Sequence, residues 1–248
     1  MKEGKTEMTK TISAISTKGG SGKSTTIRIL ASQLAHEGNT VVILDTDPQG
    51  SCAEWIANAE QRGNKIPNVG FKEIEQLSHI SPVIQHLRGK VDYILFDVQG
   101  AKTEMILPVA EASELIILPY ATTDDDWVNL LKTFKILDRI RKSEPIDPKI
   151  VLSPNRITAP DVHNPYVKQR SEIAKQMNVL AAERLIWKRG FYSEMLKRYG
   201  SIPSLKEVSD SSKKGREMND SIKNCKKEIK EFTDEMTGLI AGHTTKVA

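Results

Sequence analysis

The sequence predicts a single-domain α/β fold in which a mostly parallel, doubly wound sheet carries helices on both faces. Short apolar runs alternate with helical patterns along most of the 248 residues, which is typical of βαβ units. The runs at residues 41–44 and 93–96 are continuously apolar, as in strands that are buried on both faces. A glycine-rich turn joins the first predicted strand to the first predicted helix, an arrangement that open α/β sheets use to bind ligands.

Six segments have the composition and length of strands. They are residues 11–16, 40–45, 69–73, 91–98, 114–120 and 149–153. Helical periodicity lies between and after them, over residues 23–37, 51–61, 81–88, 103–112, 124–142 and 164–177. Strands separated by helices of this length are expected to pair in parallel.

Beyond residue 180 the pattern is helical, over about 193–199 and then from 214 to about 240. Loops are expected within the domain at residues 145–148 and 154–165, where prolines cluster. We expect residues 1–10 to form a flexible tail, residues 11–240 to form the domain and residues 241–248 to form a second tail. The length fits one α/β domain with one sheet.

Composition excludes several classes of protein. Cys52 and Cys225 are far apart, so the chain has no disulfide framework and no paired cysteines for a metal or an iron–sulfur cluster. It has no run of 18 apolar residues, and its charged first ten residues lack the apolar segment of a secretory signal. We therefore expect a cytoplasmic protein without a membrane-spanning helix.

The glycine-rich turn carries the most specific signal in the chain. It consists of Lys18, Gly19, Gly20, Ser21, Gly22, Lys23, Ser24 and Thr25. Glycines let backbone N–H groups approach a polyphosphate, and the start of the following helix adds positive potential. Lys23 offers a cation for the β and γ phosphates, and Ser24 offers a hydroxyl ligand for Mg²⁺. The pattern predicts a site for a magnesium nucleotide.

Carboxylates follow two of the predicted strands. Asp45 and Asp47 end the second strand, and Asp97 ends the fourth apolar run. Ligands of open α/β sheets bind at the carboxyl ends of the strands, so we expect these side chains near the glycine-rich turn. Asp97 has the position of a Walker B carboxylate, which lies near Mg²⁺, usually through water.

The glycine-rich turn departs from the ordinary phosphate-binding pattern in two ways. Thr17 stands where that pattern has glycine, and a second lysine, Lys18, stands at the entrance. With the acidic run at residues 45–51, this arrangement resembles the ParA/MinD family of dimerising ATPases with a deviant Walker A box. The resemblance implies that ATP binding joins two subunits face to face, and that each Lys18 reaches the phosphates of its neighbour.

The resemblance also implies roles for other residues. Lys18, Lys23 and Asp47 would be catalytic, with Asp47 positioning the attacking water. Ser24, Asp45 and Asp97 would hold Mg²⁺ or its water shell. Asn155, which follows the sixth strand, would bind adenine in addition to the eight residues of the turn.

One stretch departs from the family. After the Walker B aspartate the family commonly has Thr-Pro-Pro or Cys-Pro-Pro, whereas this chain has Val98-Gln99-Gly100-Ala101. Gly100 is a candidate hinge near the γ-phosphate. With the run at residues 122–127, this stretch favours a side branch that resembles the VirC-type proteins of conjugative DNA transfer. Thr123 or Asp124 is expected to cap the following helix rather than to take part in catalysis.

Positive charge is concentrated near the C-terminus. The formal net charge is +4, yet residues 184–230 hold 13 Lys and Arg against 6 Asp and Glu. This segment either is an ordinary solvated surface or contacts DNA phosphates without sequence preference. Apolar residues between 222 and 239 recur at helical spacing. This stripe packs on its own domain or, as in MinD-like proteins, lies on a membrane; the interleaved acidic residues disfavour the membrane.

These observations predict a slow, nucleoid-associated ParA-type ATPase. The resemblance implies that it binds ATP and Mg²⁺, forms a homodimer with ATP, binds DNA non-specifically and hydrolyses ATP when a centromere-binding partner protein stimulates it. Its cargo would be a plasmid, a chromosome origin or a transfer complex. The alternatives are a MinD-like membrane-cycling ATPase and a VirC-like ATPase of DNA transfer. A scaffold without turnover is disfavoured because Asp45 and Asp47 are both present.

Overall fold

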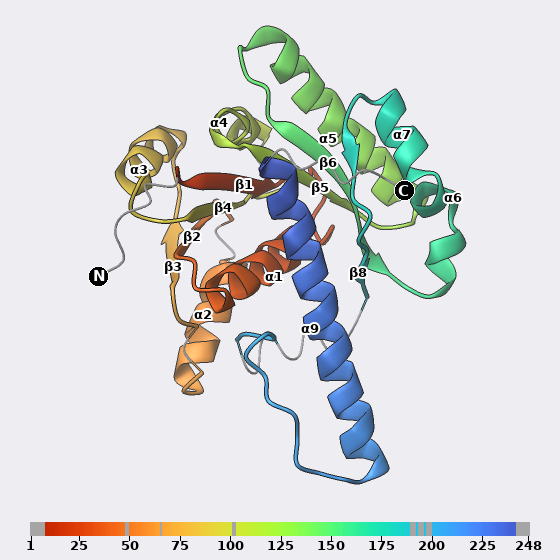
Figure 1. Ribbon diagram of the computed structural model, residues 1–248. Coiled ribbons are helices and arrows are strands. Elements are labelled where there is room, and N and C mark those ends of the chain that lie inside the picture. Colours follow the sequence, from red (N-terminus) through yellow and green to blue (C-terminus); the bar gives the residue numbers. More distant parts are fainter. Residues whose placement is uncertain are drawn as a thin grey trace.

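The computed structural model describes residues 8–47, 50–64, 66–100, 103–188, 192, 196 and 200–241. Its centre is an eight-stranded sheet in which neighbouring strands are parallel (Figure 1). The strand order is β3-β2-β4-β1-β5-β6-β7, and β8 also pairs with β6. The bounds are β1 Lys10–Ala14, β2 Val41–Asp45, β3 Val69–Glu73, β4 Tyr93–Asp97, β5 Leu115–Tyr120, β6 Lys149–Ile157, β7 Leu180–Ala181 and β8 Ile186–Trp187. The predicted α/β fold with a doubly wound parallel sheet is confirmed.

Helices cover both faces of the sheet, and each face has its own apolar core. α1 (Lys23–His36), α2 (Ser51–Gln61) and α9 (Lys213–Ile240) share one core. α3 (Ile80–Leu87), α4 (Ile106–Ala112), α5 (Asp124–Ser143) and α7 (Arg170–Gln176) share the other. Neighbouring strand residues such as Ile43 and Leu44 point into opposite cores, as the two-residue period of a strand requires. The other described helical elements are α6 (Pro165–Lys168) and the 3-10 turns Leu77–His79, Thr103–Met105 and Pro160–His163.

The apolar stripe of α9 packs on its own domain, so the first of the two sequence alternatives is confirmed. Four residues of the stripe are buried in the core that α1 also lines: Cys225, Ile229, Phe232 and Met236. Ile222, one turn before Cys225, is also buried. The beginning of α9 extends well beyond the sheet in Figure 1. Among the residues described here, no helix is both long and apolar enough to cross a membrane.

β6 is longer than predicted, and the expected loop from residue 154 is wrong over its first four residues. The strand continues through Pro154 to Ile157. Proline lacks the N–H group that a strand residue donates to its neighbour. Pro154 lies between the part of β6 that pairs with β7 and the part that pairs with β8. β7 pairs with Val151 and Leu152, whereas β8 pairs beyond the proline, beginning at Asn155. β7 and β8 have two residues each and are too short for periodicity to reveal.

The other predicted strands agree with the structure within two residues at each end, and residues 145–148 form the predicted loop. The helix expected over residues 164–177 is divided into α6 and α7 at Gln169. The helix expected over 193–199 lies outside the described residues except at Leu196, and so do residues 1–7 and 242–248. The division into one domain and two tails therefore stays a prediction.

Candidate nucleotide-binding site

The glycine-rich turn connects the carboxyl end of β1 to the first residue of α1, Lys23. Gly20 has φ 73° and Gly22 has φ 102°, in the left-handed region where glycine is favoured. A Cβ on Gly22 would lie 2.5 Å from the Nδ2 atom of Asn155. Both the backbone conformation and the space at residue 22 therefore require glycine. The turn presents the N-terminus of a 14-residue helix, which favours an anionic ligand.

A cavity of about 650 Å³ opens beside this turn, a size that suits a small-molecule ligand. Eight of the predicted site residues line it: Gly19, Gly20, Gly22, Lys23, Ser24, Thr25, Asp47 and Asn155. The other predicted site residues do not line it: Lys18, Ser21, Asp45 and Asp97. The Oγ atom of Ser21 and the Oδ1 atom of Asn155 are buried and have no hydrogen-bond partner within the described part of the chain. The size of the cavity and its donors fit a nucleotide.

Lys23 lies at the base of the cavity and is only 7% exposed. Its Nζ atom donates a hydrogen bond to the carbonyl oxygen of Lys18 at 3.0 Å. Burial lowers the pKa of Lys23, while the carboxylates of Asp97 and Asp47 oppose that shift. A buried ammonium group that faces a cavity can form strong, charge-assisted hydrogen bonds with the phosphate oxygens of a ligand.

Lys18 is bound to the start of α5 in its own chain. Its Nζ atom lies 2.7 Å from Oδ2 of Asp125 and 2.7 Å from Oδ1 of Asp126. The hydrogen bonds that Lys18 donates to Asp125 and Asp126 raise its pKa. The expected contact of Lys18 with the phosphates of a neighbour stays a prediction, and it requires that both of these ion pairs separate.

Thr17 also connects the turn to α5. Its backbone N–H donates to Oγ1 of Thr133 at 3.0 Å, and its hydroxyl lies 3.1 Å from the same atom. The residue that replaces the usual glycine is thus a tether between the turn and the helix. The Oγ1 atom of Thr123 accepts the N–H of Asp126 at the N-terminus of α5, which confirms that Thr123 caps this helix.

The aspartates at the ends of β2 and β4 lie side by side. Asp45 and Asp97 are paired in register, and they are 0% and 1% exposed. Asp97 shares a hydrogen bond with Ser24, and burial raises the pKa of its carboxyl group. One oxygen of Asp45 accepts the N–H of Asp47 at 2.9 Å. The hydroxyl of Ser24 and the carboxylate of Asp97 are the oxygen donors that Mg²⁺ prefers, so these residues fit a Mg²⁺ ion beside the cavity that Ser24 lines.

Asp45 makes the stability of the nucleotide-free chain depend on pH. Burial and the charge of Asp97 raise the pKa of Asp45 from 3.8 to about 7, so the folded state binds a proton more tightly than the unfolded state does. The contribution of Asp45 is fully present below about pH 4 and is lost as the pH rises through about 7. We expect Asp45→Asn to become more stable relative to the wild type between pH 5 and 8, by an amount on the order of 1 kcal/mol or more. Urea unfolding at both pH values measures this difference, and parallel curves for the two proteins would contradict it.

Asn155 lies under the glycine-rich turn. Its Nδ2 atom donates to Oγ1 of Thr26 at 3.0 Å and lies 3.4 Å from the carbonyl oxygen of Gly22. In this structure its amide group therefore supports the turn and the first residues of α1. Its expected contact with adenine stays a prediction.

Several cavity residues were not predicted from the sequence. Arg156 has φ 60° and lies where β8 pairs irregularly with β6, and its guanidinium donates to the carbonyl oxygen of Gly20 at 2.8 Å. Arg28 lies one helical turn after Ser24 on α1. Because residues four apart share a helix face, this spacing could have predicted that Arg28 faces the cavity. The remaining unpredicted wall comes from β8 and the residues around it: Ile186, Trp187, Lys188 and Tyr192.

Gly100 packs directly against the entrance of the turn. A Cβ on this residue would lie 3.1 Å from the carbonyl group of Lys18 and from the carbonyl oxygen of Ser16. Gly100 also lines the cavity. The candidate hinge is therefore in contact with the backbone that carries Lys18, although its movement stays a prediction.

The chain is similar in sequence to proteins of known families. It matches the family model of the VirC1 protein over residues 9–236. Protein ParA of Rhizobium radiobacter is 33% identical over 105 residues, which are 42% of this chain and 45% of that protein. Protein virC1 of Rhizobium radiobacter is 28% identical over 129 residues, which are 51% of this chain and 55% of that protein. The matched stretches span about half the length of these curated relatives.

Solved structures share the fold at low sequence identity. The McdA–ATP complex of Cyanothece has a TM-score of 0.65 at 14% identity and covers 97% of this chain and 99% of that one. MinD of Pyrococcus horikoshii OT3, complexed with Mg-ADP, has a TM-score of 0.62 at 19% identity and covers 97% and 100%. The structure of pNOB8 ParA bound to nonspecific DNA has a TM-score of 0.59 at 16% identity and covers 95% and 100%.

The family match extends over most of the described chain, and it includes the glycine-rich turn, all strands and nearly all of α9. The sequence features after Asp97 indicated a VirC-type side branch, and the matching family model is that of VirC1. The chain belongs to the VirC1 family, and it shares its fold with the ParA and MinD structures.

Proposed function

We propose that this chain is an ATPase that binds ATP and Mg²⁺, dimerises in the ATP-bound state and binds DNA without sequence preference. The observation that carries the proposal is the arrangement around the cavity. Lys23, Ser24 and Asp47 line it, and Asp97 lies in hydrogen-bond contact with Ser24 behind them. Charged groups of both signs thus converge where a triphosphate and its metal would lie.

The residues have distinct roles in this proposal. The backbone of residues 19–25 and the ammonium group of Lys23 bind the phosphates, and Ser24, Asp45 and Asp97 would hold Mg²⁺ or its water shell. Mg²⁺ supplies charge neutralisation of the phosphoryl oxygens during transfer. Asp47 orients the attacking water, and Lys18 of each subunit reaches the phosphates bound to the other.

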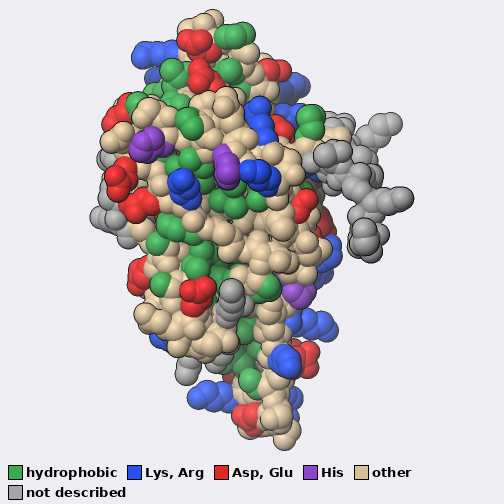
Figure 2. Space-filling view, turned by 90° about the vertical axis from the view of Figure 1, so that its left-hand side faces the viewer, with side chains coloured by type: hydrophobic (Ala, Val, Ile, Leu, Met, Phe, Trp, Pro, Cys, Tyr) green, Lys and Arg blue, Asp and Glu red, His purple; other side chains and the backbone are tan. Residues whose placement is uncertain are grey.

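Support for DNA binding comes from α9 and the residues around it. Several basic residues are occupied by contacts within the chain: Arg184 lies 3.1 Å from Glu231, and Lys230 lies 2.7 Å from Asp234. Lys214 and Lys223 are exposed and make no ion pair among the described residues. Both lie in the first half of α9, and the beginning of this helix extends beyond the sheet in Figure 1. Figure 2 shows Lys and Arg side chains with acidic ones at that end of the molecule.

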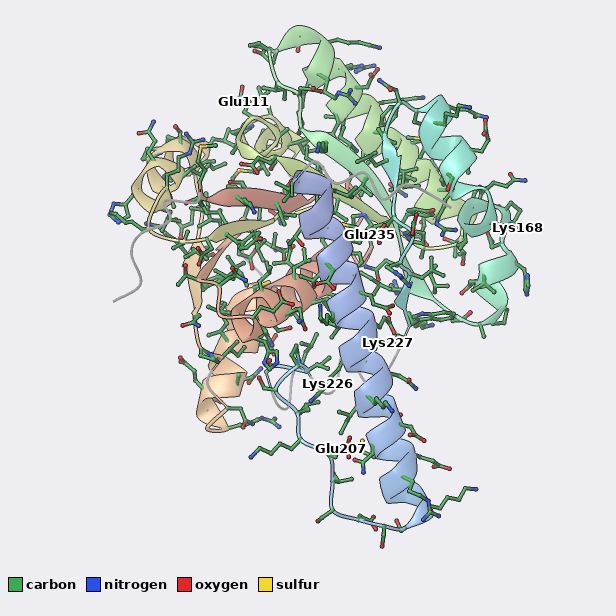
Figure 3. The ribbon with its side chains drawn as sticks, in the orientation of Figure 1. Glu111, Lys168, Glu207, Lys226, Lys227 and Glu235 are labelled. Carbon is green, nitrogen blue, oxygen red and sulfur yellow. The ribbon has the colours of Figure 1, made fainter. Side chains whose placement is uncertain are left out.

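Figure 3 labels two further lysines of this helix, Lys226 and Lys227. Lys226 donates to the backbone carbonyl of Leu205, and Lys227 lies 3.8 Å from Glu231. These contacts leave the first half of α9 as the better candidate for phosphate contacts.

The structure of pNOB8 ParA is described as bound to nonspecific DNA, which supports the proposed DNA binding and nucleoid association. The proposal further includes a DNA cargo that this ATPase positions and a centromere-binding partner protein that stimulates its hydrolysis. A second candidate is a VirC-like ATPase of conjugative DNA transfer, which the family match over residues 9–236 favours. Both candidates share nucleotide-dependent DNA binding and differ in cargo.

The test is binding to a random DNA duplex, measured by fluorescence anisotropy with ATP or ADP across a salt series. We expect tighter binding with ATP, with an affinity that falls as salt rises. Changing Lys214 and Lys223 together to Glu should weaken binding about tenfold or more and reduce the salt slope by roughly one per lost contact. Lys72→Glu, on β3 at the sheet edge, is the matched control and should bind normally. Equal binding with ATP and ADP would argue against the proposed switch.

A further inference from the structure

A thiol and two carboxylates meet in the interior of the molecule, beside the nucleotide site. Asp45 ends β2, Asp97 ends β4 and Cys52 is the second residue of α2. One ligand atom of each lies within 4.8 Å of the others. All three residues are at most 1% exposed. No sequence pattern indicated this group, because the three residues come from three separate elements.

The contacts within the group are direct. The thiol of Cys52 donates to Oδ2 of Asp97 at 3.3 Å, and the backbone N–H of Cys52 lies 3.4 Å from Oδ2 of Asp45. The register of β2 with β4 places the two aspartates side by side, and the start of α2 holds the sulfur against them. The three donor atoms thus have the spacing of metal ligands before any ion binds.

Charged side chains of both signs surround the thiol of Cys52. Two buried carboxylates and a thiol are faced by the cations Lys23 and Arg28, and Arg28 hydrogen-bonds to Cys52. Burial raises the pKa of all three acidic groups, because it disfavours their negatively charged forms. A bound divalent cation would reverse those shifts, because it stabilises the deprotonated ligands.

The chemistry of the donors selects the ion. Mg²⁺ prefers six oxygen ligands and is not bound through sulfur. Thiolate together with carboxylates suits Zn²⁺ or its softer analogue Cd²⁺, and three protein ligands leave one position for water. We propose that Asp45, Cys52 and Asp97 form a binding site for a thiophilic divalent cation of the Zn²⁺ and Cd²⁺ type.

On binding, the Cys52 thiol loses its proton to solvent and the sulfur becomes a thiolate ligand. Ser24 connects the group to the outside, since it lines the cavity and also hydrogen-bonds to Asp97. If the proposed function holds, an ion in this site also withdraws Asp97 from the Mg²⁺ shell. The binding itself does not depend on that function.

The test uses the full chain without nucleotide, in a buffer with a phosphine reductant, and CdCl₂ as the probe. The ultraviolet absorption of the cadmium–thiolate bond and isothermal titration calorimetry report binding. We expect saturation at one Cd²⁺ per chain. Cys52→Ala should abolish the absorption and weaken binding by roughly 100-fold or more, at least as much as loss of a supporting ligand costs.

Cys225→Ala is the matched control. Cys225 is the other buried cysteine and lies in the core between α9 and the sheet, so its loss should leave the cadmium signal unchanged. Cys52→Ser keeps the size of the side chain and guards against misfolding, which circular dichroism monitors. Absence of a one-equivalent site, or equal cadmium affinity of wild type and both Cys52 variants, would overturn the proposal.

Discussion

Replacing Lys18 with alanine should reduce the rate of ATP hydrolysis by about 10³-fold while largely preserving ATP binding. A cation that reaches the transferring phosphoryl group from a neighbouring subunit is worth factors of this size. Lys23 differs because it lies at the base of the cavity, and Lys23→Ala should weaken ATP binding itself. Phosphate release measures turnover, and a fluorescent ATP analogue measures binding.

The ion pairs of Lys18 add a second part to this prediction. Because Asp125 and Asp126 each lie 2.7 Å from its Nζ atom, the lysine must leave both before it reaches a neighbour. Changing both aspartates to asparagine should lower the ATP concentration needed for dimerisation, as measured by light scattering with a non-hydrolysable ATP analogue. Asp138→Asn, farther along α5, is the matched control. Full turnover by Lys18→Ala would show that no lysine acts across the dimer.

Replacing Asp47 with asparagine should lower turnover by about 10²- to 10⁴-fold, the usual effect of losing a group that handles the proton of a nucleophile. Asp47 lines the cavity, and its backbone N–H is fixed by Asp45. The amide has nearly the same shape as the carboxylate, so ATP binding and dimerisation should remain. The ATP-bound dimer should therefore persist longer on DNA.

The control for this variant is Glu54→Gln, on the exposed side of α2. It removes one negative charge near the site without removing a cavity side chain. Single-turnover hydrolysis and the lifetime of the DNA complex should be measured on the same samples. If Asp47→Asn hydrolyses ATP at the wild-type rate, another group positions the water.

The sequence predicted the fold and the centre of the site because both depend on local patterns. Continuous apolar runs identified the buried strands β2 and β4. Glycines at residues 20 and 22 indicated the turn, and their left-handed backbone shows why. The strand that continues through Pro154 was missed because proline normally argues against a central strand. Here β7 pairs with β6 before the proline and β8 pairs with it after the proline, which no local sequence pattern reports.

Local patterns thus determined the class of fold, the phosphate-binding turn and the acidic strand ends, since each depends on residues that are close in sequence. The tertiary structure alone decided which distant residues meet. It paired Lys18 with α5 of its own chain, placed Arg156 and Trp187 on the cavity wall and brought Cys52 between two aspartates. Those contacts arise from strand register and helix packing across long sequence separations, and neither is encoded in the neighbourhood of a single residue.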